Sequence, residues 1–181
     1  YIQTKLANSF RRQNPSERRH TPMDQKALSL ALKVVLVGFA IAGAIVYVWL
    51  LPMLGGSFLR AYPDFAHCYW PWLIFLWITA LPCYIALFFG WSIATEIGRD
   101  NSFSIKNSIS LRNVAILAAA DAVFFFLGNI LYLLLNISHP FVFLLSCFLV
   151  FGGVAIAVAA ACLSHLIYKA AKLRQENDLT I

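Results

Sequence analysis

Apolar and polar positions are arranged in long blocks along this chain rather than in short alternation. Four apolar blocks cover about 27–51, 69–94, 114–135 and 141–168, with polar segments before, between and after them. A helix that rises about 1.5 Å per residue needs roughly 20 apolar residues to cross a bilayer, and each block meets that length. The pattern predicts an all-α integral membrane protein, folded as a bundle of four transmembrane helices.

Helix signals at the block ends refine the expected boundaries. Thr21 and Pro22 precede the first block as an N-cap and a first helical residue would. Pro52 and the pair Gly55-Gly56 follow it and are expected to close the first helix. Pro82 lies inside the second block, where it is expected to bend the helix.

Composition supports the membrane class. Of 181 residues, 61% are hydrophobic and only 12% are charged. Soluble domains carry about 45–50% apolar and about 25% charged residues. The four cysteines have no metal-ligand spacing, so we interpret them as small buried hydrophobic residues.

The net charge is +6, and the distribution of Lys and Arg among the polar segments predicts the topology. Lys and Arg number six in the segment 1–26, three between the second and third blocks, and three in 169–181. The two other connections hold one, Arg60. By the positive-inside rule, both termini and the middle connection are expected in the cytoplasm. The chain then divides into a basic cytoplasmic arm (1–26), a transmembrane domain (27–168) and a cytoplasmic helix extension with a tail (169–181).

Two charged residues lie well inside the predicted spans, Lys33 in the first and Asp121 in the third. With this topology both fall in the cytoplasmic half of the bilayer at similar depth. An unpaired charge there costs about 2.5–3.5 kcal/mol on insertion scales, so we expect the two to form an intramembrane pair that locks the bundle. Two other interpretations stay open: Lys33 extends toward the headgroups, and Asp121 serves as a proton or ligand site.

Helical spacing extends this polar feature. Asn129 and Tyr132 fall near the same face of the third span as Asp121 and predict a polar seam, to which His165 of the fourth span is a candidate addition. Small residues recur in the fourth span at Gly153, Ala157 and Ala161, with His165 next on that face. Small residues at this spacing let helices approach closely in membranes.

The polar segments contain the candidate contacts with partners. The arm carries two arginine pairs, Arg11-Arg12 and Arg18-Arg19. Attraction to anionic lipids explains them, and docking to an acidic protein is the alternative. Phe103 in the middle connection is a further candidate. Leu179 and Ile181 in the tail could insert into a groove of a partner, unless the tail is a frayed terminus.

The sequence contains no pattern that predicts an enzyme. No phosphate-binding loop, nucleophile elbow, metal-ligand pair or dinucleotide fingerprint is present. We therefore expect no catalytic residue, no metal and no cofactor. The arm lacks a nucleic-acid reading motif, so direct nucleic-acid binding is not expected.

Three short segments resemble those of a known family. They are Tyr62-Pro63 before the second span, the connection from Phe103 to Arg112, and the terminal segment from Glu176 to Ile181. In these the chain resembles the YoaS-like bacterial membrane proteins, domain of unknown function family 2975. The resemblance implies a protein with four spans in the bacterial inner membrane and no assigned activity, and it suggests a membrane-bound partner of small regulators.

We therefore expect a non-enzymatic protein of the inner membrane. It would act as an interaction or regulatory protein, or as an accessory subunit of a larger membrane complex, and bind a protein partner through its cytoplasmic side or its transmembrane faces. The alternative function is a small-molecule or ion binder, or a transporter component, that uses Lys33, Asp121 and Asn129. Four spans without repeats do not favour a complete transporter.

Overall fold

The computed structural model describes residues 25–61, 63–136 and 140–178. They are almost wholly helical. In chain order the elements are α2 (Gln25–Ile45), a five-residue π-helix η2 (Val46–Leu50), α3 (Leu51–Ala61), a 3₁₀ segment η3 (Pro63–Cys68), α4 (Tyr69–Gly98), α5 (Ile105–Leu134) and α6 (Pro140–Asp178).

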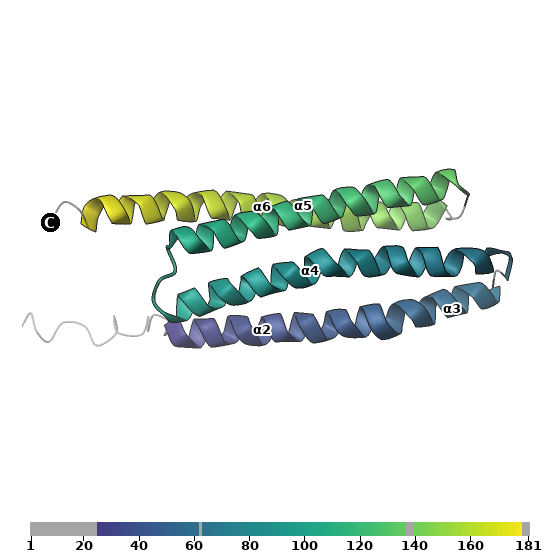
Figure 1. Cartoon of the computed structure of the whole chain (residues 1–181), viewed down its shortest axis with the longest axis horizontal. Coiled ribbons are helices and arrows are strands. Elements are labelled where there is room, and N and C mark those ends of the chain that lie inside the picture. The colour runs from purple at the N-terminus through teal and green to yellow at the C-terminus, as the bar shows by residue number, and fades with distance from the viewer. Residues whose placement is uncertain (1–24, 62, 137–139, 179–181) are drawn as a thin grey trace, which may run out of the picture.

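Four long helical rods lie side by side, and each runs antiparallel to the rod before it in the sequence (Figure 1). The first is α2 continued through η2 into α3, and the others are α4, α5 and α6. Each rod is long and apolar enough to cross a membrane, with candidate spans Gln25–Ala61, Ala66–Gly98, Ile105–Leu134 and Val142–Asn177. Large apolar side chains such as Val48 and Phe151, 74% and 75% exposed, cover the outside. The four predicted spans are confirmed as helices of that kind.

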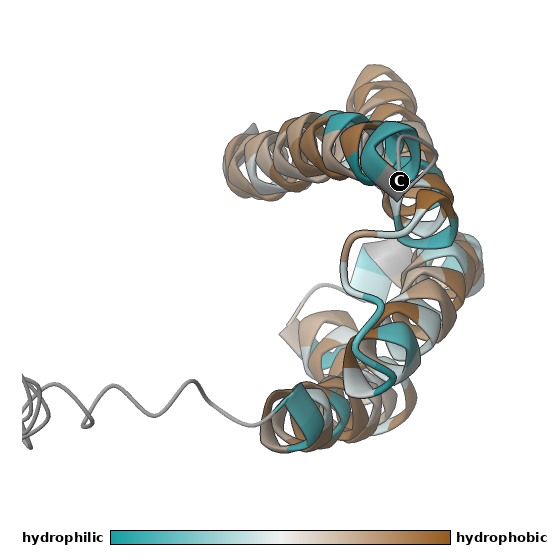
Figure 2. Ribbon diagram, turned by 90° about the vertical axis from the view of Figure 1, so that its left-hand side faces the viewer, coloured by the Kyte–Doolittle hydropathy of each residue, from teal (hydrophilic) through white to brown (hydrophobic). Residues whose placement is uncertain are grey.

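The rods pack only on their neighbours in the sequence. Among the described helices, α2 contacts α4, α4 contacts α5, and α5 contacts α6, while α2 touches neither α5 nor α6. Seen end-on, the four form a curved, open row (Figure 2). The predicted all-helical fold with four spans is thus confirmed, and its helices are arranged as an open row.

The first rod does not end where the sequence predicts. The helix passes Pro52 and continues to Ala61. Pro52 has no N–H, and in a regular α-helix its ring would clash with the carbonyl four residues before it. The helix therefore forms the π-turn η2, in which the Leu51 N–H bonds to the Val46 carbonyl, five residues earlier instead of four. This leaves the Tyr47 carbonyl without a main-chain donor, and Trp77 Nε1 of α4 donates to it at 3.0 Å.

Small residues line the contact between α5 and α6. On α6 they recur at intervals of three, four or seven residues, as Ser146, Gly153, Ala157, Ala160, Ser164 and Ala171. Ser108 of α5 and Ser164 form a reciprocal clasp: Ser108 Oγ donates to the Ser164 carbonyl at 3.0 Å, and Ser164 Oγ donates to the Ser108 carbonyl at 2.7 Å. Such bonds require the two backbones to lie close together.

The predicted packing face of the fourth span is correct in part. Ala157 is buried, and Gly153 lies against Ala122 of α5. Ala161 is exposed, so its assignment to this face is wrong. A strict four-residue spacing drifts around the helix, whereas alternating three- and four-residue steps stay on one face, and Ala160 takes the place of Ala161.

A glycine allows α5 to approach α4. A Cβ atom at Gly128 would lie 2.2 Å from the ring of Phe75. Phe75 is buried, and its ring packs against those of Phe125 and Tyr132 at centroid distances of 5.7 and 5.3 Å. The aromatic group has no room to withdraw, so Gly128 fixes the distance between the two helices.

The connection between α4 and α5 is organised around a buried carboxylate. Glu96 in the last turn of α4 accepts from Lys106 Nζ at 2.7 Å and from Asn101 Nδ2 at 3.2 Å. Ser104 caps α5 by accepting from the Asn107 N–H at 3.2 Å. The Asn107 side chain donates back to the Ser102 carbonyl at 3.0 Å. These bonds join the end of one helix to the start of the next.

The described parts of the three basic segments lie at one end of the row. Figure 1 shows the start of α2, the α4–α5 connection and the end of α6 together on its left. We call this the basic end. Helix α6 continues through Lys169, Lys172 and Arg174 to Asp178, so the expected helix extension beyond the fourth span is present.

A substitution of Gly128 by Ala tests the close approach of α4 and α5. The added methyl group overpacks against Phe75, and we expect a loss of about 1–3 kcal/mol in the free energy of unfolding. Gly152→Ala on α6 is the matched control, because its Cβ meets nothing within 4 Å. Thermal unfolding of both variants in a mild detergent measures the difference. Equal midpoints would contradict this packing.

A double-mutant cycle tests the origin of the π-turn. Trp77→Phe leaves the Tyr47 carbonyl unpaired in an apolar setting, so we expect a loss of about 1 kcal/mol. Pro52→Ala restores an N–H, lets the helix regain regular bonding and removes the need for the indole. The effect of Trp77→Phe on the unfolding midpoint is therefore expected to shrink in the Pro52→Ala background. Additive effects would show that the proline and the tryptophan are independent.

Candidate functional site

A polar cluster lies at mid-depth, where three helical elements meet. Its members are Tyr47 from η2, Thr79 and Cys83 from α4, and Asp121 from α5. The Tyr47 hydroxyl and Thr79 Oγ1 are 3.3 Å apart. Because Thr79 already donates to the Leu76 carbonyl at 2.7 Å, Tyr47 is the donor in this pair. Since α4 lies between the other two helices, the cluster extends across one face of α4.

Asp121 is the cluster member whose hydrogen-bonding capacity is least satisfied. Its Oδ1 is enclosed by protein atoms and has no hydrogen-bond partner in the described part of the chain. Its Oδ2 receives only the Cys83 thiol, with the sulfur at 3.9 Å. A thiol is a weak donor, whereas a carboxylate can accept about four bonds. The described helices thus place an acid within a predicted span without supplying the donors that it needs.

The predicted pair of Lys33 and Asp121 is not formed. The Lys33 ammonium lies 5.3 Å from the centre of the Trp91 ring on α4, close to the basic end. Asp121 is on α5, which α2 does not contact. The helix order in the row therefore separates the two charges, however similar their depths. The interpretation that Lys33 extends toward the headgroups stays a prediction.

The other members of the predicted polar seam serve separate local purposes. Tyr132 donates to the Pro71 carbonyl of α4 at 3.0 Å, which ties the two helices together. Asn129 is buried, and its side chain donates to the Phe125 carbonyl of its own helix at 2.8 Å. His165 is exposed on α6 and is not part of the seam. Lys33, Asp121 and Asn129, the set of the alternative function, are thus not one site.

The candidate partner contacts fall mostly outside the described residues. This applies to Arg11, Arg12, Arg18 and Arg19 of the arm and to Leu179 and Ile181 of the tail. Phe103 lies in the α4–α5 connection and is 56% exposed, as a contact residue would need to be. Its role stays a prediction.

Sequence reasoning missed Tyr47, Thr79 and Cys83. A signal was present in that Thr79 and Cys83 are four residues apart, so both lie on one face of a helix. Cys83 was expected to be a buried hydrophobic residue, but it is exposed beside Asp121. Tyr47 had no signal, because its place beside α4 depends on how α2 packs there.

In the residues that the structure covers, no three His, Cys, Asp or Glu side chains gather as metal ligands would. The cluster holds one carboxylate, one thiol and two hydroxyl groups. Its clearest chemical capacity is to accept hydrogen bonds at Asp121 from a donor that another molecule brings into the membrane.

Comparison with known proteins supports the resemblance seen in the sequence. A relative described as the uncharacterized membrane protein YoaS of Bacillus subtilis (strain 168) is 28% identical over 155 residues, which cover 84% of this chain and 97% of the relative. No solved structure matches the chain. A family model described as protein of unknown function (DUF2975) matches residues 53–181, which include the α4–α5 connection and the tail. This chain is a membrane protein that belongs to the DUF2975 family.

Proposed function

We propose that this protein is a non-enzymatic subunit of a bacterial inner-membrane complex, which binds a transmembrane helix of a protein partner at the polar cluster. The observation that carries the proposal is the Asp121 carboxylate, which within residues 25–61, 63–136 and 140–178 has one enclosed oxygen unpaired and the other bonded only to a thiol. In a bilayer, lipid tails supply no donor, so intramembrane acids pair with protein groups or water.

The shape of the row supports a partner helix. Helices α2 and α6 each pack on a single neighbour, and the apolar window of α2 has no buried residue. Cys83, beside Asp121, is itself exposed. A partner helix with a Lys, Arg, Ser or Thr at mid-depth would both cover apolar surface and supply the missing donor. Interhelical hydrogen bonds of this kind contribute about 1–2 kcal/mol in model peptides.

Orientation follows from the basic end. In the proposed topology Lys26, Arg99, Lys106 and the α6 extension face the cytoplasm, as the positive-inside rule requires. The exposed Phe103 and the arm and tail would then provide cytoplasmic contacts with a regulator or with the rest of the complex. The protein would then contact the same assembly at two places, within the membrane at Asp121 and in the cytoplasm.

In-cell photocrosslinking tests the proposal. A photoreactive amino acid in place of Cys83 is expected to yield a discrete adduct, and Asp121→Asn is expected to reduce its yield about fivefold or more, in line with 1–2 kcal/mol of lost bonding. Asp121→Glu keeps the charge and is expected to restore the adduct. The matched position is Val123, 58% exposed on a different face of α5. The proposal would be overturned if the adduct yield from Val123 equals that from position 83, or if Asp121→Asn leaves the yield unchanged.

The isolated chain provides the control for folding. Because Asp121 has no ion-pair partner in the described chain, Asp121→Asn is expected to keep or raise the thermal midpoint of the purified protein in detergent. If Asp121→Asn lowers the adduct yield but does not lower the thermal midpoint, Asp121 acts in the contact with the partner helix. A lowered midpoint would assign Asp121 to the fold of this chain and contradict the proposal.

A further inference from the structure

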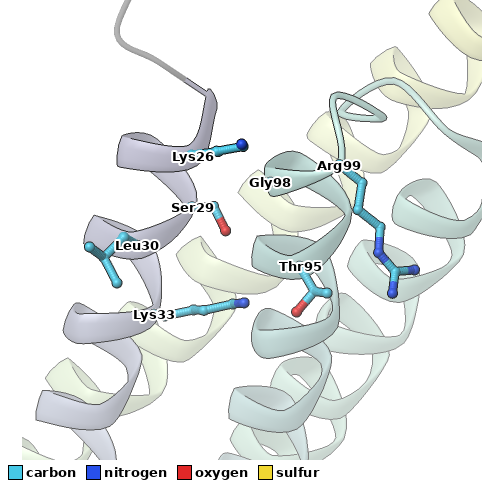
Figure 3. A pocket seen from close by; sticks show the side chains of 7 residues that line it. All are labelled: Lys26, Ser29, Leu30, Lys33, Thr95, Gly98 and Arg99. Atoms are coloured by element: carbon cyan, nitrogen blue, oxygen red, sulfur yellow. The ribbon is translucent and has the colours of Figure 1, made fainter.

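A second polar feature lies at the basic end, away from Asp121. A pocket of about 330 Å³ opens between the first turns of α2 and the last turns of α4 (Figure 3). Lys26, Ser29, Leu30 and Lys33 contribute from α2, and Thr95, Gly98 and Arg99 from the end of α4. The α2 residues follow the spacing of one helical face, so they line the pocket from one side.

The walls of this pocket are fixed by a close helix contact. Ser29 Oγ donates to the Ala94 carbonyl at 2.6 Å, and Ala94 is fully buried. A Cβ at Gly98 would lie 2.8 Å from Ser29 Oγ, so a glycine is needed for this approach. Thr95 likewise donates its hydroxyl proton to the Trp91 carbonyl at 2.9 Å. Both hydroxyl groups are thus used within the chain, which leaves the lysines as the donors of the pocket.

The pocket is positively charged; the Lys33 ammonium lies 5.3 Å from the centre of the Trp91 ring, a contact that leaves its charge unpaired. In Figure 3 the ammonium groups of Lys26 and Lys33 both point from α2 toward α4. Neither forms an ion pair with an acid of the described chain; the two ion pairs found there, from Arg99 and Lys106, both go to Glu96. The Arg99 guanidinium points to the far side of α4, with Nη1 3.7 Å from Glu96 Oε1. Lys26 and Lys33 therefore supply the charge.

Several acceptors near the pocket, at the end of α4, already have donors within the chain. The last carbonyls of α4 would repel an anion, but Glu96 O accepts from the Arg99 and Asn101 N–H groups, and Ile97 O accepts from the Asp100 N–H. The Glu96 carboxylate is bonded to Lys106 at 2.7 Å. An anion in the pocket thus meets two ammonium groups, while the nearby Glu96 carboxylate is already bonded to Lys106.

We propose that the pocket of Lys26 and Lys33 binds a phosphate group, that of an anionic phospholipid headgroup. The pocket lies where α2 leaves its apolar span, and Leu30, 65% exposed, borders it on the side of the apolar surface of α2. Acyl chains can lie along that surface while the phosphate reaches both lysines. Basic pockets between transmembrane helices bind anionic headgroups in this way. A soluble phosphate compound offers the same group without the chains.

Native mass spectrometry of the full chain in a neutral detergent tests the proposal, with phosphatidylglycerol as the probe and phosphatidylcholine as the zwitterionic reference. Each lysine near an anionic group is worth about fivefold in affinity, so Lys26→Gln/Lys33→Gln is expected to weaken phosphatidylglycerol binding about thirtyfold. Lys169→Gln/Lys172→Gln removes two charges from the same end on α6 and is expected to change binding less than twofold. Lys26→Arg/Lys33→Arg keeps the charge and is expected to bind.

Competition with inorganic phosphate identifies the source of the group. Binding of phosphatidylglycerol that resists millimolar phosphate supports a lipid site, and displacement by phosphate supports a site for soluble phosphate compounds. If the α2 and α6 double variants lose the same amount of phosphatidylglycerol binding, the lipid responds to the total charge of the surface and not to the pocket, which would overturn the proposal. Equal binding of the two lipids by the unmodified chain would overturn it as well. The thermal midpoint of each variant confirms that the lysines act on binding and not on folding.

Discussion

The structure is governed by one constraint: at membrane depth, polar groups must find partners inside the protein, because lipid tails offer none. The helix contacts follow it. Where Pro52 disturbs the backbone, Trp77 donates to the carbonyl that is left. Tyr84 of α4 donates to the Ala40 carbonyl of α2 at 3.0 Å, and Tyr132 of α5 donates to a carbonyl of α4. Ser108 and Ser164 satisfy each other between α5 and α6.

Asp121 is the exception inside the spans, whereas Asn107 Oδ1, the other buried unpaired side-chain atom of the described residues, lies at the start of α5. The enclosed oxygen of Asp121 is unpaired in the described chain, although the surrounding helices are otherwise closely fitted. The open row explains how this arises, since among the described helices α2 and α6 do not meet and so do not close over the cluster. The partner helix that we propose would complete both the hydrogen bonding of Asp121 and the packing of the row.

Hydropathy and charge were sufficient to predict the four spans and to group the basic segments, because both are properties of single segments. They could not predict which helices touch. The pairing of Lys33 with Asp121 required a contact between α2 and α5, and the row places α4 between them. Pro52 was expected to end the first helix because a proline usually does. The helix continues because a π-turn accommodates the proline and the Trp77 indole donates to the Tyr47 carbonyl. Ala161 failed as a packing residue because the real seam alternates steps of three and four.

A distance between α2 and α6 tests the open row most directly. Leu30 and Leu166 lie at corresponding levels, near Ser29 and Ser164, and are 65% and 62% exposed. Spin labels at these two positions, in a background free of native cysteines and diluted with unlabelled chain in liposomes, report their separation by pulsed electron paramagnetic resonance. With two helices between them, we predict a distance beyond about 20 Å. A distribution centred near the roughly 10 Å of adjacent helices would show a closed bundle and contradict the account.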